Sequence, residues 1–164
     1  MTESTNNTIS DEEQIARIIN REWMAGNILL PMAFALRLNE TYLSVNRLCV
    51  ESYDEDVKRF VNNHKSYQTS SGDSYFRALL DVGNVRSIKV SNEGNPIEIA
   101  VEVETRDLHI KSHAGIFVRA EDKNIFPGKK DTDDLLPTGV SSEFVLQKIR
   151  WELLDLAVLQ QCKL

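Results

Sequence analysis

Cysteine and long apolar runs are scarce in this chain. Its two cysteines, Cys49 and Cys162, are too few for a disulfide framework in 164 residues, and we expect both to be reduced thiols. No stretch reaches the roughly 20 apolar residues that a transmembrane helix needs. The first ten residues have neither the basic start nor the apolar segment of a signal peptide. We therefore expect a cytoplasmic protein with no membrane partner.

Basic residues are also in the minority. The chain has 19 Lys and Arg against 25 Asp and Glu, which gives a net charge of -6 and a pI near 5.1. Non-specific binding to nucleic acid depends on Lys and Arg that neutralise phosphates. The composition therefore argues against a nucleic-acid partner. A partner protein with a basic surface would suit the acidic chain better.

No complete catalytic, metal-binding or cofactor-binding signature occurs. Two of the three histidines, His109 and His113, are four residues apart, a spacing that on a helix would place them about 6 Å apart and allow one metal ion to be shared. Their neighbours Leu108, Ile110 and Gly115 favour an extended path, on which the same spacing is about 13 Å. We therefore predict no metal site and no cofactor, and treat the histidines separately.

The length is that of one ordinary domain with a core of its own. Residues 1–9 contain almost nothing to bury, so we expect them to be a disordered tail before a single domain at residues 10–164. We predict an α+β fold, in which N-terminal, middle and C-terminal helices pack on a mainly antiparallel sheet of about five strands.

Three segments carry the signals of helices. The first, residues 10–26, begins with a capping box and continues with isoleucines that share one helical face. The second, residues 52–63, begins with another capping box, and the third covers residues 142–160. The two capping pairs are Ser10 with Glu13 and Ser52 with Glu55.

Apolar and polar residues alternate most clearly over residues 97–104, which predicts a strand with one buried face. We expect residues 85–90 to pair with it through a turn centred on Glu93 and Gly94, a register that places Val90 opposite Ile97. Weaker strand signals occur at residues 42–50, 75–80 and 114–119.

The predicted final helix has two apolar stripes. One contains Val145 and Ile149, and the opposite side carries Trp151, Leu154 and Val158. A helix packed between the sheet and other elements would bury both stripes. Alternatively, Trp151, Leu154 and Val158 form a contact surface for a protein partner or for a second copy in a homo-oligomer.

Short motifs at residues 26–34, 42–47 and 112–116 resemble those of a family of small uncharacterised bacterial proteins. That family has a Pro-x-Ala-Phe step, a Leu-Ser-Val-x-Arg strand and a Ser-His-Ala segment, and the resemblance covers about residues 22–118. Here Ile110-Lys111 stands where Asn-Pro often precedes the histidine. The resemblance implies no known activity, but it directs attention to four positions. These are Phe34, Ser44, Arg47 and His113.

Two hypotheses of function follow. The first is a non-enzymatic accessory or protein-interaction module of the bacterial cytoplasm, associated with a toxin-antitoxin or defence system. The alternative is a small hydrolase or nucleotide-processing enzyme, in which His113 acts as acid or base with Ser44, Arg47 or an acidic group. The enzyme hypothesis requires His113 and its partner side chain to lie within about 8 Å of each other, because a direct proton relay needs hydrogen-bond contact.

Overall fold

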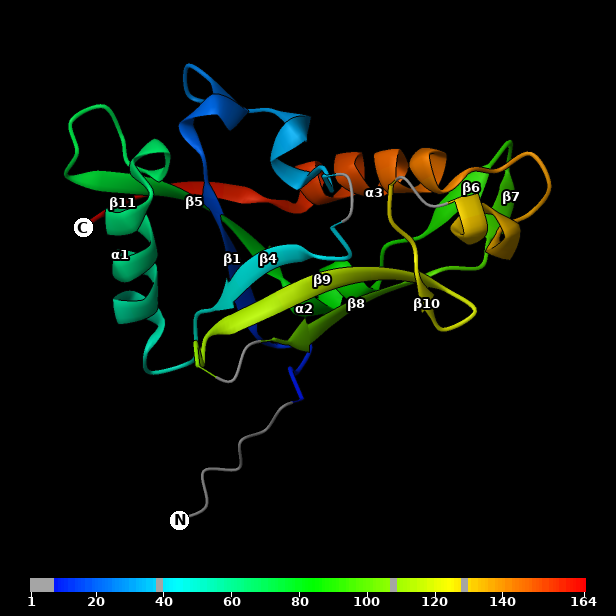
Figure 1. The fold of residues 1–164 in the computed structure, drawn as a ribbon, viewed down its shortest axis with the longest axis horizontal. Coiled ribbons are helices and arrows are strands. Elements are labelled where there is room, and N and C mark those ends of the chain that lie inside the picture. Colours follow the sequence, from blue (N-terminus) through cyan, green and yellow to red (C-terminus); the bar gives the residue numbers. More distant parts are fainter. Residues whose placement is uncertain (1–7, 38–39, 107–108, 128–129) are drawn as a thin grey trace, which may run out of the picture.

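The computed structural model describes residues 8–37, 40–106, 109–127 and 130–164, and it has the expected α+β architecture (Figure 1). Its main sheet has seven strands, all paired antiparallel, in the order β10-β9-β4-β1-β5-β11, with β8 also paired to β9. These strands are β1 (Gln14–Ile19), β4 (Leu43–Arg47), β5 (Ser74–Asp81), β8 (Ala100–Thr105), β9 (His113–Ala120), β10 (Lys123–Asn124) and β11 (Val158–Lys163).

Shorter elements connect these strands. Two small ribbons pair β2 (Met24–Ala25) with β3 (Ile28–Leu29) and β6 (Val90–Asn92) with β7 (Asn95–Ile97). The α-helices are α1 (Tyr53–Asn63), α2 (Val82–Arg86) and α3 (Ser142–Leu156), and the 3-10 helices are η1 (Arg21–Trp23), η2 (Pro31–Phe34), η3 (Lys65–Tyr67) and η4 (Lys130–Leu135). No helix in the described ranges is long and apolar enough to span a bilayer.

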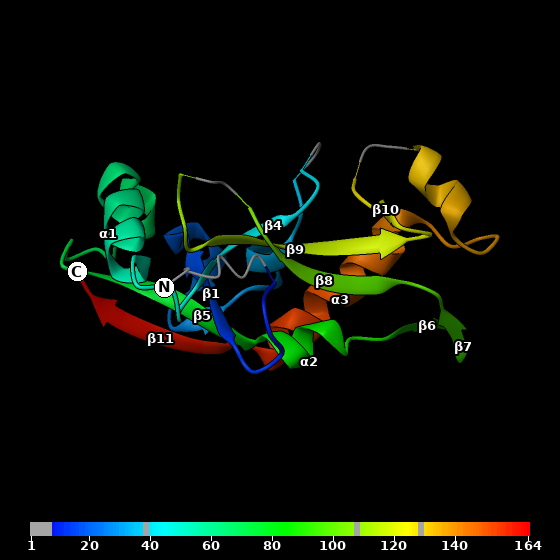
Figure 2. The same ribbon diagram turned by 90° about the horizontal axis from the view of Figure 1, so that it is seen from below.

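Buried side chains form one core on each face of the sheet. The larger core joins Ile15 and Val45 of the sheet to Val145 and Ile149 of α3, and the smaller core joins alternate residues of β1 to α1. Figure 2 shows α1 and α3 far apart along the sheet. Because β1 contributes to both cores, it is buried on both of its faces.

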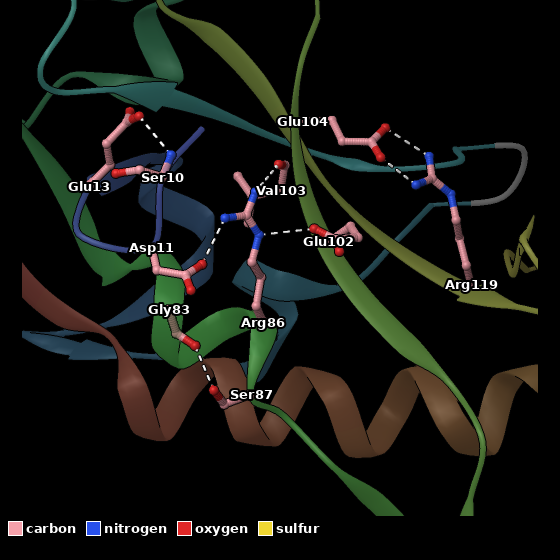
Figure 3. Close-up of polar contacts among 10 residues, drawn as sticks. All are labelled: Ser10, Asp11, Glu13, Gly83, Arg86, Ser87, Glu102, Val103, Glu104 and Arg119. Atoms are coloured by element: carbon pink, nitrogen blue, oxygen red, sulfur yellow. Dashed lines mark hydrogen bonds and ion pairs between the residues drawn. The ribbon is translucent and has the colours of Figure 1, made fainter. Parts of the chain in front are cut away.

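The predicted N-terminal helix is wrong, because residues 14–19 form strand β1. The Ser10 amide does donate to the Glu13 carboxylate at 3.0 Å, as a capping box requires, but this contact closes a turn before the strand (Figure 3). Five consecutive residues from Ile15 to Ile19 are buried. A β-branched run buried on both sides suits a central strand, whereas a surface helix would leave part of it in water.

The middle helix is confirmed as α1, whereas the final helix is shorter than predicted. It begins at Ser142 with Ser141 accepting a hydrogen bond from the Phe144 amide, and it ends at Leu156. Residues 158–163, of which 158–160 were predicted to be helical, pair with residues 74–79 of β5 instead. Backbone pairing to a central strand therefore overrides the helical pattern of the sequence.

The strands predicted at residues 75–80 and 114–119 are confirmed as β5 and β9, and the strand predicted at residues 42–50 forms over the shorter range of β4. The turn at Glu93 and Gly94 is also confirmed, with Val90 opposite Ile97, but this ladder extends no further toward residues 88 and 99. Residues 82–86, which overlap the predicted strand at 85–90, form helix α2. The expected tail falls largely on residues 1–7, outside the described ranges, while Ile9 is buried in the larger core.

Arg86 of α2 connects three separate segments of the chain (Figure 3). Its guanidinium donates to the Asp11 carboxylate at 2.8 Å, to the Glu102 carboxylate at 2.9 Å and to the Val103 carbonyl at 3.0 Å. Arg119 holds Glu104 in the same region of the sheet. Arg86 therefore fixes the N-terminal turn and α2 against β8.

We expect Arg86→Met to lower the free energy of unfolding by about 1–3 kcal/mol, because it removes charge-assisted hydrogen bonds and leaves the Val103 carbonyl without this donor. Urea unfolding measures the change. Arg59→Met is the matched control, because Arg59 and Glu55 form an exposed pair at 3.5 Å that should contribute less than about 0.5 kcal/mol. Equal effects of the two substitutions would contradict this account.

Candidate functional site

Strands β4 and β9 bring Ser44 and His113 together. The register places Asn46 opposite His113 and Ser44 opposite Gly115, so these side chains share one face of the sheet. The Ser44 Oγ and His113 Nε2 atoms are 3.3 Å apart. Two of the three residues of the enzyme hypothesis are therefore within hydrogen-bond reach.

Arg47 and Phe34 do not join this pair. Successive strand residues face opposite sides, so Arg47 does not share the face of Ser44 and Asn46. Its guanidinium binds the Glu13 carboxylate with Nη2–Oε2 and Nε–Oε1 distances of 2.8 and 2.9 Å. Phe34 is buried in the larger core. Arg47 thus fixes the turn before β1, and Phe34 is a core residue.

A cavity of about 340 Å³ opens beside Ser44 and His113. Sheet, helix α1 and the segments around η1 and η3 all contribute to its wall. The lining residues are Arg17, Ile18, Trp23, Arg37, Glu40, Ser44, Asn46, Asp56, Phe60, Tyr67, Ile110 and His113. We call it the Arg17 cavity.

Arg17 lines this cavity where the sheet separates. β1 pairs with β4 at only two positions, Ile15 with Arg47 and Ala16 with Asn46, although it pairs with β5 over its whole length. Beyond Ala16, the Arg17 side chain makes the connection instead, because its Nη1 donates to the Ser44 carbonyl at 2.8 Å and its Nε donates to the Ala33 carbonyl. The guanidinium therefore replaces the missing ladder between β1 and β4.

The charge of Arg17 is buried without a carboxylate in hydrogen-bond contact among the described residues, and Glu40 acts on its pKa only through space. The side chain is 9% exposed, and within the described ranges no Asp or Glu forms an ion pair with it. Burial lowers the pKa of Arg17 to about 10, so the group remains charged at neutral pH. Its two hydrogen bonds use Nε and Nη1, whereas Nη2 forms no hydrogen bond with a residue in the described ranges.

Aromatic rings form a second part of the wall. The Arg17 guanidinium lies 4.8 Å from the centre of the Trp23 ring, and Tyr67 meets Trp23 edge-on at 5.7 Å. Phe60, which is 38% exposed, lies 4.8 Å from Tyr67. The cavity thus combines a buried cation with exposed and half-buried ring surfaces.

Asp56 of α1 holds the remaining wall in place. Its Oδ2 accepts hydrogen bonds from the Ser52 hydroxyl at 2.9 Å and from the Ser112 hydroxyl at 2.7 Å, and Asn46 donates to the same Ser112 hydroxyl at 2.9 Å. Ser112 is fully buried. This network ties the first turn of α1 to β4 and to the start of β9, and it positions His113, the next residue.

The predicted contact surface falls on two elements. Trp151 is 51% exposed on α3, but Val158 lies in β11, where it is 59% exposed, so the three residues do not share one helical stripe. Leu154 is half-buried and packs against the larger core. Their role in binding a partner stays a prediction.

In the described ranges no group of three His, Cys, Asp or Glu side chains could hold a metal ion. Cys49 and Cys162 are free thiols. His109 lies outside the lining of the Arg17 cavity. Comparison with family models, curated proteins and solved structures finds no match for this chain.

The sequence indicated Ser44 and His113, which line the Arg17 cavity, but the predictions did not include Arg17, Trp23 and Asp56. A signal for Arg17 was present, because it is the one charged residue in the apolar run Ile15–Ile19, and a charge in a fully buried strand is rare without a partner. The predicted helix placed Arg17 on a solvated face, which concealed that signal. Trp23 and Asp56 reach the cavity only through long-range packing.

The Glu13 and Arg47 pair gives a test of the structural role of Arg47. Burial raises the pKa of Glu13, but hydrogen bonds from Arg47 and Cys49 outweigh it and hold the pKa below the ordinary 4.5. A lowered carboxyl pKa contributes stability above the unfolded value, and this contribution is lost as the pH falls through the folded pKa. We expect Glu13→Gln to cost about 1–3 kcal/mol near pH 7.

Urea unfolding of both proteins at several pH values measures this difference, which should shrink as the pH falls below 4.5. Glu12→Gln, at the preceding and more exposed position, is the matched control. A difference that is the same at neutral and acidic pH would show that the Glu13 charge does not stabilise the fold.

Proposed function

We propose that the protein is a non-enzymatic binding module that holds a small molecule in the Arg17 cavity, and that this molecule carries an anionic group and a planar ring. The observation that carries the proposal is the buried Arg17 guanidinium, which donates to two main-chain carbonyls and forms no ion pair with any carboxylate in the described part of the chain. A charge removed from water is costly unless a counter-charge approaches it. An anionic ligand would supply that counter-charge.

The geometry of Arg17 suits a phosphate or carboxylate. With Nε and Nη1 engaged by the Ala33 and Ser44 carbonyls, the guanidinium is fixed in orientation, and its Nη2 is left for a ligand oxygen. Arg37 and His113 are further donors in the same wall. A fixed guanidinium loses little further freedom when it binds an oxyanion.

The two carboxylates of the wall do not cancel this preference. Asp56 already accepts hydrogen bonds from Ser52 and Ser112. Glu40 is exposed and accepts from the Arg37 amide at 2.6 Å. Solvent screens an exposed carboxylate, so Arg17 is the buried charge that a ligand meets.

A planar ring is favoured by Trp23, Phe60 and Tyr67. Stacked or edge-on contacts with aromatic side chains contribute about 0.5–1.5 kcal/mol each beyond the burial of area. The cavity volume of about 340 Å³ lies at the lower end of the usual range for small-molecule sites, about 300–1,000 Å³. This size suits a single ring system with one anionic substituent.

Thermal unfolding with adenosine monophosphate, inorganic phosphate and adenosine tests the proposal, because these probes present ring and anion together and separately. At about 100 times its dissociation constant, a ligand adds about 2.7 kcal/mol, so a bound probe should raise Tm by several degrees. The monophosphate should bind more tightly than either part. No shift with any probe, or an equal shift with adenosine, would contradict the proposal.

Variants of the cavity locate the effect. Arg37→Met and Arg17→Met should each weaken binding of the monophosphate, and Arg17→Lys should retain part of it, because the charge remains. Arg59→Met removes an exposed arginine outside the cavity and should bind as the unaltered protein does. Arg37 is exposed, so its substitution keeps the test valid even where an Arg17 variant fails to fold.

A second function, hydrolysis, is favoured by the Ser44 and His113 pair. With Oγ and Nε2 3.3 Å apart, His113 could accept the Ser44 proton while Oγ attacks an ester carbonyl, and the proton would then pass to the leaving alcohol. In the second step His113 would take a proton from water, the water oxygen would attack the acyl group on Ser44, and the proton would return to Ser44 Oγ as the acid leaves. Arg47 has no part in this version, because Glu13 holds it elsewhere.

Hydrolysis of p-nitrophenyl acetate measures this activity. If the pair is catalytic, Ser44→Ala and His113→Gln should each lower the rate by about 10²–10⁴-fold, the usual range for loss of an acid-base group. His109→Gln is the matched control, because His109 does not line the cavity. Rates that survive both cavity substitutions would exclude the enzyme and leave the binding module.

A further inference from the structure

Strand β11 is an edge of the main sheet. It pairs with β5 on one side, and no other strand of the described ranges pairs with it. Figure 2 shows β11 along one margin of the molecule. An edge strand presents unpaired backbone N–H and C=O groups to its surroundings, and these groups can pair with another chain.

The hydrogen-bond pattern shows which residues of β11 face the open side. The Leu164 amide donates to the Asp73 carbonyl at 3.0 Å, in the same register as the β11 and β5 ladder. In antiparallel pairs, hydrogen-bonded positions alternate along the strand. The even-numbered residues of β11 therefore bond to β5, whereas Leu159, Gln161 and Lys163 direct their N–H and C=O groups to the free edge.

This edge lacks the devices that usually prevent pairing. Its six residues contain no proline and one charge, Lys163 at the end, and the ladder with β5 runs without a bulge from Val158 to Lys163. Natural monomers commonly protect edge strands by charge, proline, bulges or short length. Val158, at the other end, is 59% exposed. The strand is therefore open to pairing along its length.

We propose that two copies of the chain associate through antiparallel pairing of their β11 strands about a twofold axis at Gln160. In this register Leu159 of each copy forms a hydrogen-bonded pair with Gln161 of the other, and Val158 of each lies opposite Cys162 of the other. In this register odd-numbered residues pair with odd-numbered residues and even with even, so each face of one sheet continues into the same face of the other. The two main sheets then become one continuous sheet.

Charge complementarity favours a second copy over an unrelated strand. The same register places Lys163 of each copy opposite Ala157 of the other, directly after the last turn of α3. That turn carries exposed Asp155 and the negative end of the helix dipole. Each Lys163 therefore lies beside a negative site of the other copy, and the twofold axis gives two such contacts in the dimer. Trp151 and Asp155 are one helical turn apart and lie on the same exposed face of α3.

Sedimentation equilibrium over a wide range of concentrations tests the proposal. The unaltered protein should form a dimer, and Gln161→Pro should weaken its association by about tenfold or more, because proline removes an outward N–H without removing a bond to β5. Gln161→Thr is the matched control, because it also loses the side-chain bond to Ser74 but keeps the N–H, and it should dimerise. A monomer at all concentrations, or a dimer unaffected by the proline, would overturn the proposal.

Exchanging the charges of Lys163 and Asp155 distinguishes this register from other ways in which two copies could pair. Lys163→Glu should weaken the dimer several-fold, and adding Asp155→Lys to it should restore association, because the attraction is then rebuilt with reversed signs. Failure of the double variant to recover, when Lys163→Glu alone weakens the dimer, would rule out the proposed register. Unchanged thermal unfolding of the variants at dilute concentration shows that the fold is intact.

Discussion

The structure depends on the contacts that the Arg17 guanidinium makes at the point where β1 and β4 separate. The main sheet has one part made of β10, β9, β8 and β4 and another made of β5 and β11, with β1 between them. Only two backbone pairs join β1 to β4, and Arg17 extends that connection through the carbonyls of Ser44 and Ala33. A backbone ladder at this position would close the sheet. A side chain in its place leaves room for a cavity and places a charge in its wall.

Local sequence signals predicted the elements whose stability is local. The helix signal at Ser52 predicted α1, although its hydroxyl donates to Asp56 and makes no cap. The weaker strand signals predicted β4, β5 and β9, and the Glu93-Gly94 turn predicted a hairpin that exists. Residues 14–19 were predicted as helix because a short apolar run fits a helical face as well as a buried strand. Residues 158–163 form β11 because β5 is available as a partner. In both segments tertiary pairing decides the structure, and no local pattern records it.

The candidate site was predictable only where its residues lie in local sequence patterns. Ser44 and His113 lie in short motifs and on adjacent strands, so the sequence indicated both. Arg47 was grouped with them, although alternation along one strand already places it on the other face from Ser44. Asp56 and Trp23 come from segments whose position depends on how α1 and η1 pack. The predicted Trp151 and Val158 surface divides between a helix and an edge strand, because the chain changes from α3 to β11 at Ala157.

We propose above all that the buried charge of Arg17 faces a site for an anion. The most direct measurement is nuclear magnetic resonance of the arginine side-chain nitrogens during titration with adenosine monophosphate at low temperature, where guanidinium N–H signals persist. We predict that the Arg17 signals shift and saturate, whereas those of Arg86, which is held by Asp11 and Glu102, stay in place. Arg17 signals that do not move, or that move no more than those of exposed Arg59, would contradict it.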